Sequence, residues 1–183
     1  MARPRSYDPD LIAEKITETF WKTGYEATAV ADLVASTGLK KGSLYNSYGD
    51  KSKMFQIALL RYDREMVARM VTLMDQLPGR EAIAALLEAP AKAVLGGDQR
   101  GCLLCNSMGE YAYLDDVARG IVDRSREHFE SAIGRALKRI DGRSGTVSAN
   151  ELQALYFGMQ VMSRGGVAAE ALNAIGQSAM ARL

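Results

Sequence analysis

The sequence has few of the residues on which enzymes and metal sites depend. Its 183 residues include two cysteines, one histidine, four prolines and one tryptophan. Two cysteines three positions apart cannot make a disulfide framework, and without nearby His, Asp or Glu they leave a tetrahedral zinc shell unfilled. With a single histidine, general acid–base catalysis has few participants. We therefore expect no metal and no cofactor.

Catalytic motifs are absent as well. The sequence holds no carboxylate pair at a suggestive spacing, no Ser-His-Asp set, no phosphate-binding loop and no dinucleotide-binding glycine pattern. The pair Asp115-Asp116 is interpreted most simply as a helix cap and its neighbour. The sequence therefore favours a non-enzymatic function, with a small helical enzyme as a distant alternative.

Long apolar runs are also missing. No stretch approaches the roughly 18 apolar residues that cross a membrane, and the N-terminal segment MARPRSYDPD has no apolar core of the kind that secretory signals carry. Hydrophobic residues nevertheless make up 48% of the chain, which is ample for a buried core. These features predict a cytoplasmic protein without a membrane partner.

Net charge gives no bulk sign of nucleic-acid binding, because 23 basic residues face 22 acidic ones. The charges are, however, segregated along the chain. Residues 8–37 hold two lysines and six acidic residues, a local charge of −4, whereas residues 38–53 hold four lysines and one aspartate, a local charge of +3. The basic segment is short, so any contact with nucleic acid is expected to be local.

The pattern of apolar residues predicts an all-α chain of about nine helices. Ala, Leu, Glu, Lys, Arg and Met dominate, and β-branched alternation is absent. Asp8-Pro9 is typical of a helix start and Gly24 of a helix end, while Asp50 can cap a long fourth helix over residues 50–76. Further helices are predicted at 80–95, 101–113, 115–140, 148–165 and 168–182, with a glycine-containing break at 141–145.

Residues 28–51, TAVADLVASTGLKKGSLYNSYGDK, have the pattern of a helix-turn-helix motif. Thr28 can cap a short helix, Gly38 can supply the positive φ of a sharp turn, and Lys40 to Ser47 fits a second short helix. The apolar residues that can pack these helices together are Val30, Leu33, Val34, Leu39 and Leu44. The second helix then presents small, polar and basic side chains outward, which suits entry into the major groove.

The N-terminal segment resembles the TetR family of one-component regulators, because many of its residues match the family pattern at fixed spacings. The family pattern of a threonine in helix two, a turn glycine and then K-G-[ST]-L-Y-x-x-[FY]-x-x-K is met by Thr28, Gly38, Lys41, Gly42, Ser43, Leu44, Tyr45, Tyr48 and Lys51, and the end of the first helix by Phe20, Gly24 and Tyr25. The resemblance covers residues 8–55 closely and the rest only in layout. It implies a three-helix head, residues 1–53, which a long fourth helix joins to a helical-bundle effector and dimerisation domain, residues 54–183.

The resemblance also implies a double-stranded operator DNA partner and a set of contacts. Thr28 and Lys51 are expected to meet phosphates at helix N-termini, and Gly42 to let its helix approach the DNA backbone closely. The side chains expected to face the groove or its walls are Lys40, Lys41, Ser43, Tyr45 and Asn46. Asn46 can pair with adenine or hold a phosphate, so the operator sequence stays open.

The sequence of the larger C-terminal part predicts an effector pocket and a dimer interface. Methionine fills irregular gaps and tyrosine places a hydroxyl in an apolar wall, so the pocket candidates are Met66, Met70, Met108, Tyr111, Phe129, Tyr156 and Met159. The last two predicted helices carry apolar stripes that suit a four-helix interface between two copies of the chain. The interface candidates are Leu152, Leu155, Leu172 and Ile175. For both sets the alternative is ordinary core packing.

The run Gly101-Cys102-Leu103-Leu104-Cys105-Asn106 resembles one branch of the TetR family, in which some members sense electrophiles or oxidants. Cys102 matches that branch, whereas Cys105 is an addition. A helix N-terminus favours a thiolate, and the C-x-x-C spacing would allow a reversible disulfide. The alternative is a pair of buried, inert cysteines.

Together these features predict a homodimeric repressor that an unknown small-molecule effector releases from its operator. Thiol-based regulation through Cys102 and Cys105 is the alternative mode of control.

Overall fold

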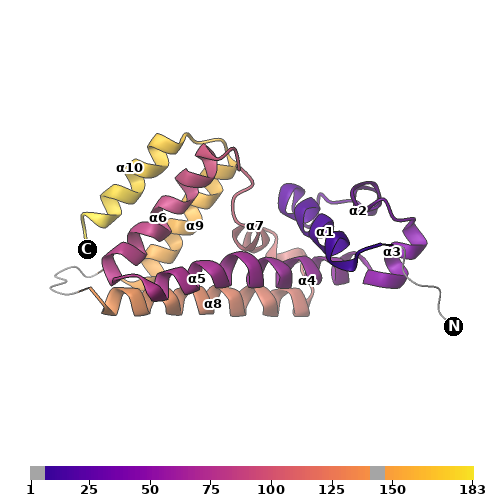
Figure 1. Ribbon diagram of the computed structural model, residues 1–183, viewed down its shortest axis with the longest axis horizontal. Helices are drawn as coiled ribbons and strands as arrows, with labels where there is room; N and C mark the ends of the chain where they lie inside the picture. Colours follow the sequence, from indigo (N-terminus) through magenta and orange to yellow (C-terminus); the bar gives the residue numbers. More distant parts are fainter. Residues whose placement is uncertain (1–6, 141–146) are drawn as a thin grey trace.

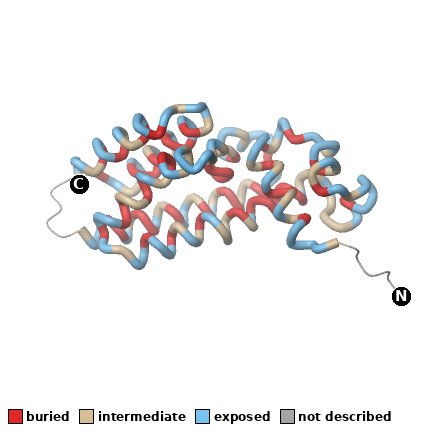
Figure 2. The backbone as a smooth tube through the Cα atoms, turned by 45° about the horizontal axis from the view of Figure 1, so that its top comes forward, coloured by how far each residue is buried: buried red, intermediate tan, exposed pale blue. Residues whose placement is uncertain are grey.

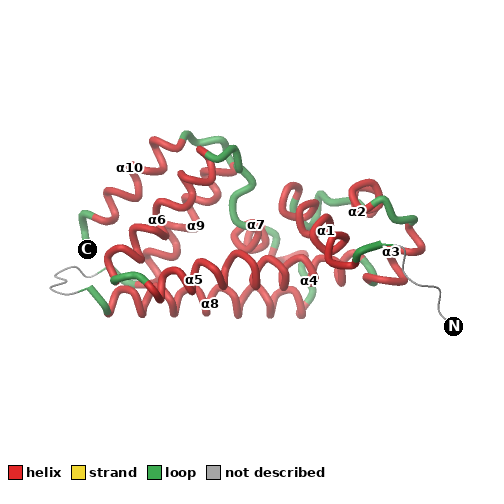
Figure 3. Tube along the Cα trace, in the orientation of Figure 1, coloured by secondary structure: helices red, strands yellow, loops and turns green. Residues whose placement is uncertain are grey.

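The computed structural model describes residues 7–140 and 147–183, and these residues form helices and loops without a strand (Figure 3). The predicted break at 141–145 lies outside the described residues. In chain order the helices are α1 (Pro9–Thr23), α2 (Val30–Thr37), α3 (Lys41–Tyr48), α4 (Lys51–Tyr62), η1 (Asp63–Val67), α5 (Ala68–Gln76), α6 (Gly79–Leu95), α7 (Leu103–Gly109), η2 (Tyr111–Tyr113), α8 (Asp116–Lys138), α9 (Ala149–Arg164) and α10 (Ala169–Met180).

The helices are arranged as a small head and a larger body (Figure 1). The head consists of α1, α2 and α3. A rod formed by α4, η1 and α5 runs from the head along α8, and α6, α9 and α10 lie over the far part of that pair, with α7 between the two regions. Since α4, η1 and α5 follow one another directly over residues 51–76, the described chain has nine α-helical bodies, as the sequence predicted.

Local capping signals place the first and fourth helices where they were predicted. The Asp8 carboxylate accepts the N–H of Asp10 at 2.9 Å, and Pro9 occupies the first helical position. The Asp50 carboxylate accepts the N–H of Lys53 at 2.9 Å and so caps α4. Both caps bind backbone donors that the first helical turn leaves without a partner.

Several boundaries differ from the prediction, those of α8, α9 and α10 by one or two residues only. The N-cap of α2 is Ala29 rather than Thr28, and the Ala29 N–H donates to the Asp32 carboxylate at 2.8 Å. Helix α3 begins one residue later than predicted and ends at Tyr48. The single helix predicted over 101–113 is instead α7 followed by the 3₁₀ turn η2, because the α-helical pattern ends at Gly109.

One wide turn interrupts the rod in the middle of the body. Residues 63–67 form a π-helical turn, and the Asp63 carboxylate within it accepts a hydrogen bond from the Ser125 hydroxyl of α8 at 2.6 Å. Turns of this kind are often found at functional sites. Here the turn lies beside a cavity, which Val67 helps to line.

Buried residues form one continuous core that runs from the head into the body. Figure 2 shows them along the facing sides of the rod and α8 and on the inner faces of the head helices. In the head, the rings of Phe20 and Phe55 meet edge to face with their centroids 5.0 Å apart. None of the helices in the described ranges combines the length and apolarity needed to span a bilayer.

Candidate functional site

A glycine turn sets the angle between α2 and α3. Gly38 has φ 72° and ψ 4°, in the left-handed region that glycine adopts at little cost, and its N–H donates to the Val34 carbonyl at 3.0 Å. Leu33 from α2 and Leu44 from α3 are both fully buried on the inner side of the turn. The sequence prediction of a helix-turn-helix over this segment is therefore confirmed in its geometry.

The outer face of α3 carries the predicted groove-facing residues. Lys40, Lys41, Gly42, Ser43, Tyr45 and Asn46 are all exposed. The ammonium of Lys41 lies 5.9 Å from the centroid of the Tyr45 ring. No atom lies within 4 Å of where a Cβ of Gly42 would stand, so the packing of the chain does not require glycine there.

The inner face of α3 is fixed to the rest of the head. The Tyr48 hydroxyl donates to the Pro9 carbonyl at 3.1 Å, and the hydroxyls of Tyr7 and Ser47 are hydrogen-bonded at 2.6 Å. With Leu44 in the core, these bonds join α3 to the start of α1. The exposed face of α3 is consequently held in one orientation, which a surface that reads DNA requires.

Lys51 stands at the start of α4, beside the loop between α1 and α2. Its ammonium lies 4.6 Å from the centroid of the Tyr25 ring and donates to the Glu26 carbonyl at 3.3 Å. The side chain is half-buried. Its charge is thus held at a helix N-terminus, the kind of place where phosphates bind.

Thr28 does not share the exposure of the other predicted DNA contacts. Its side chain is fully buried. The hydroxyl donates to the Gly24 carbonyl at 2.5 Å and is hydrogen-bonded to the Thr23 hydroxyl, also at 2.5 Å. Thr28 therefore ties the loop between α1 and α2 to the end of α1, and we leave it out of the DNA-contacting surface.

A cavity of about 150 Å³ lies in the body next to the head. Four of the seven predicted pocket residues line it, namely Met66, Met70, Phe129 and Tyr156. Met108 and Tyr111 are instead exposed, because α7 ends at Gly109, and Met159 is buried away from the cavity. The lining residues that the sequence interpretation missed include Trp21, Tyr62, Cys102, Phe157 and Gln160.

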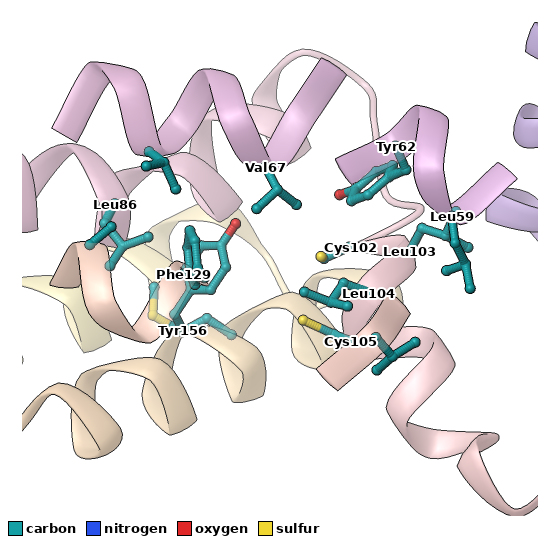
Figure 4. Packing of buried hydrophobic residues seen from close by; sticks show 14 of the residues in the cluster. Leu59, Tyr62, Val67, Leu86, Cys102, Leu103, Leu104, Cys105, Phe129 and Tyr156 are labelled. Atoms are coloured by element: carbon teal, nitrogen blue, oxygen red, sulfur yellow. The ribbon is translucent and has the colours of Figure 1, made fainter. Parts of the chain in front are cut away.

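The two cysteines lie close together at the start of α7, and both are buried as free thiols (Figure 4). A hydrogen bond with the Cys105 thiol, aided by one with the Tyr62 hydroxyl, lowers the pKa of Cys102 to about 7, although burial acts in the opposite sense. Burial raises the pKa of Cys105. Cys102 is also part of the cavity wall, so a molecule in the cavity could reach its sulfur.

The four predicted dimer residues divide into two pairs. Leu152 and Leu172 are 1% and 0% exposed, so they belong to the core of their own subunit and offer no surface to a partner. Leu155 and Ile175 are half-buried. The apolar stripe lies on α9 and α10, but its most buried members face inward.

Comparisons with known proteins agree with this geometry. Residues 12–57 match the model of the bacterial regulatory proteins of the tetR family. The chain is 32% identical to the HTH-type transcriptional repressor ComR of Escherichia coli K12 over 57% of its own length, and this match spans 51% of ComR. It is 28% identical to the HTH-type regulator YezE of Bacillus subtilis 168, over 76% of this chain and 73% of YezE.

A solved structure has a similar fold along nearly the whole chain. It is a cysteine mutant of the TetR family regulator CifR complexed with double-strand operator DNA, with a TM-score of 0.77 and 26% identity over 97% of this chain and 98% of that one. The chain belongs to the TetR family of transcriptional regulators, and its relatives are regulators rather than enzymes.

Proposed function

We propose that this chain is a homodimeric repressor that binds double-stranded operator DNA through the outer face of α3. The observation that carries the proposal is the row of exposed polar and basic side chains from Lys40 to Asn46 on a helix whose other face is fixed to the head. Lysines and hydroxyls suit phosphate contacts, while Tyr45 and Asn46 can reach base edges. Lys51 is proposed as a further phosphate contact at the start of α4.

The proposal includes release of DNA by a small molecule in the body cavity. Such a molecule would bind best to the conformation whose two heads are wrongly spaced for successive major grooves, about 34–36 Å apart. Its differential affinity for the two conformations sets how far operator affinity falls. The cavity touches both the rod and the head, since Met70 and Trp21 both line it.

A second copy of the chain would pair on the outer faces of α9 and α10. Exposed small or β-branched residues recur there at helical spacing, on α9 at Ala154, Gly158 and Val161 and on α10 at Ala171, Ala174 and Ser178. Small residues let helices of two subunits approach closely. Pairing matters for function because a single head with a few phosphate contacts binds DNA weakly.

A gel-shift assay with the DNA upstream of the protein's own gene tests the proposal. We expect Lys41→Ala and Tyr45→Ala to weaken binding, each by about tenfold, the effect of losing roughly one good contact. Lys138→Ala, at the far end of α8, serves as the matched control and should bind like the parent. Absence of binding at low salt, or equal binding by all four proteins, would overturn the proposal.

We propose a second way of controlling operator binding, which acts through Cys102 and Cys105. The hydrogen bond between the two thiols and the pKa of Cys102 of about 7 favour reversible oxidation. Hydrogen peroxide would take two electrons and the two thiol protons, so that the S–S bond forms, the O–O bond breaks and two molecules of water result. In this mode, mild peroxide weakens operator binding by the parent but not by Cys102→Ser or Cys105→Ser. Unchanged binding by the oxidised parent would eliminate it.

A further inference from the structure

Aromatic side chains make up much of the cavity wall. Five rings line it, those of Trp21, Tyr62, Phe129, Tyr156 and Phe157. Three of them, Phe129, Tyr156 and Phe157, lie within 6.4 Å of one another by their centroids. A volume of about 150 Å³ suits roughly one aromatic ring, since an engineered apolar cavity of about that size in another protein holds benzene.

Apart from the Cys102 thiol, whose pKa of about 7 leaves it partly ionised at neutral pH, the described residues that line the cavity carry no unpaired charge. The carboxylate of Asp98 is already paired, because it accepts two hydrogen bonds from the Arg100 guanidinium at 3.0 and 2.8 Å. None of the lining residues in the described ranges is a lysine, an arginine or a histidine that could pair with an anion. Burying an unpaired charge is costly, so these walls favour a neutral molecule.

A hydroxyl in the wall offers one polar contact. The Tyr156 oxygen accepts a hydrogen bond from the Gln160 side-chain amide at 2.8 Å, and both residues are buried. This arrangement leaves the Tyr156 proton to donate to a hydroxyl or carbonyl oxygen of a ligand. Figure 4 shows Tyr156 beside Phe129 in the buried hydrophobic cluster.

Trp21 belongs to the head and yet forms part of the same wall. Its indole N–H, near the end of α1, donates to the Gly101 carbonyl at 2.8 Å. Its ring meets the Tyr62 ring edge to face at 4.9 Å and lies 3.7 Å from the Arg100 guanidinium carbon. A molecule in the cavity would therefore touch the head directly, besides acting through the rod.

Two anchors from the body hold the chain just after Trp21. Arg164, the last residue of α9, donates to the carbonyls of Trp21 at 3.1 Å and Lys22 at 3.0 Å. The Glu110 carboxylate accepts the backbone N–H groups of Tyr25 at 2.7 Å and Glu26 at 3.0 Å. We call residues 21–26, bound by these two side chains, the anchored segment.

Building on the proposed function, we propose that the cavity takes a neutral molecule of about one aromatic ring with a hydroxyl or carbonyl group. We further propose that Trp21 conveys its presence to the head by displacing the anchored segment from Glu110. A ligand that pushes on the Trp21 ring acts within five residues of both Glu110-bound amides. The bound and empty states then differ in the orientation of α1, and with it α3.

Because Trp21 is the only tryptophan, its fluorescence reports cavity occupancy without DNA. The full chain is titrated with phenol, with benzoate as the anionic probe and with benzyltrimethylammonium as the cationic one. We expect a saturable change with phenol alone. Ala93→Leu, which fills the cavity, should weaken phenol binding by about tenfold or more, whereas Ala84→Leu on the same helix should not. A stronger response to either ion, or none to phenol, would overturn the ligand class.

Hydrogen exchange tests the role of the anchored segment. With phenol bound, the amides of Tyr25 and Glu26 should exchange about tenfold faster than in the empty protein, as expected when their bonds to Glu110 open more often. In Glu110→Ala, which removes both acceptor oxygens, the two amides should already exchange fast, with little further change on adding phenol. Unchanged exchange in a phenol-saturated parent would overturn the coupling.

These two measurements also separate this inference from the proposed function. A chain that passes both and yet does not bind operator DNA would overturn the repressor proposal alone. A chain that binds operator but fails both measurements would overturn the inference alone.

Discussion

In the head, the proposed DNA contacts on α3 lie within seven consecutive residues, whereas the cavity in the body takes its walls from α1, the rod, α6, α7 with the loop before it, α8 and α9. The first surface is a property of one short helix and its turn. The second exists only when six parts of the chain pack together. Trp21 connects the two regions, because it belongs to the head helix α1 and faces the cavity.

The largest expected effect is a loss of stability, and it compares Phe20 in the head with Phe129 in the cavity wall. Phe20 is fully buried against Phe55, so Phe20→Ala should lower the free energy of unfolding by about 3–5 kcal/mol. Phe129 already faces empty space on one side, so Phe129→Ala should cost less than Phe20→Ala. Urea unfolding of both variants measures this difference. An equal or larger loss for Phe129→Ala would mean that the cavity is filled by packing.

A smaller effect is expected at Gly42, where one substitution should change stability and DNA binding in opposite directions. Gly42 lies on the open face of α3, so Gly42→Ala should raise stability by about 0.5–1 kcal/mol while it weakens operator binding. The control is Gly120→Ala within α8, where the neighbour of the added methyl is the flexible end of Arg124. It should give a similar gain and leave operator binding unchanged. If Gly42→Ala bound operator as well as the parent, α3 would not approach the DNA backbone closely.

The smallest expected effect concerns pH. The hydrogen bond from Arg100 holds the pKa of Asp98 below its usual value. Because the folded-state pKa is the lower one, the stabilisation is complete above the unfolded value of about 3.9 and is lost as pH falls through the folded value. Trp21 emission, which senses Arg100, should therefore change in this acid range. In Asp98→Asn the acid change should be absent, and a change of the same size would contradict this assignment.

A structural feature could be predicted from the sequence when residues close to it in the chain determine it. Asp8, Gly38 and Asp50 act on residues within one helical turn, and each was placed correctly. Thr28 was not, since a threonine just before a helix can either cap it or turn inward, and packing against the end of α1 decides between the two.

The body was less predictable because its features depend on distant neighbours. An apolar stripe on α9 and α10 looks the same whether it faces a partner or its own core, so Leu152 and Leu172 were assigned to the wrong side. Trp21 and Gly101 are 80 positions apart, and no local pattern indicates that they meet. The two rod methionines that line the cavity, Met66 and Met70, were found because helical spacing alone places them on one face, although Met66 is also partly open to solvent.

The most direct test of the central claim is the salt dependence of operator binding by the parent and by Lys41→Ala. If the outer face of α3 meets phosphates, the logarithm of affinity falls linearly with the logarithm of salt concentration, and the slope for Lys41→Ala should be smaller by about one. Equal slopes for the two proteins, or affinity that does not respond to salt, would contradict the account.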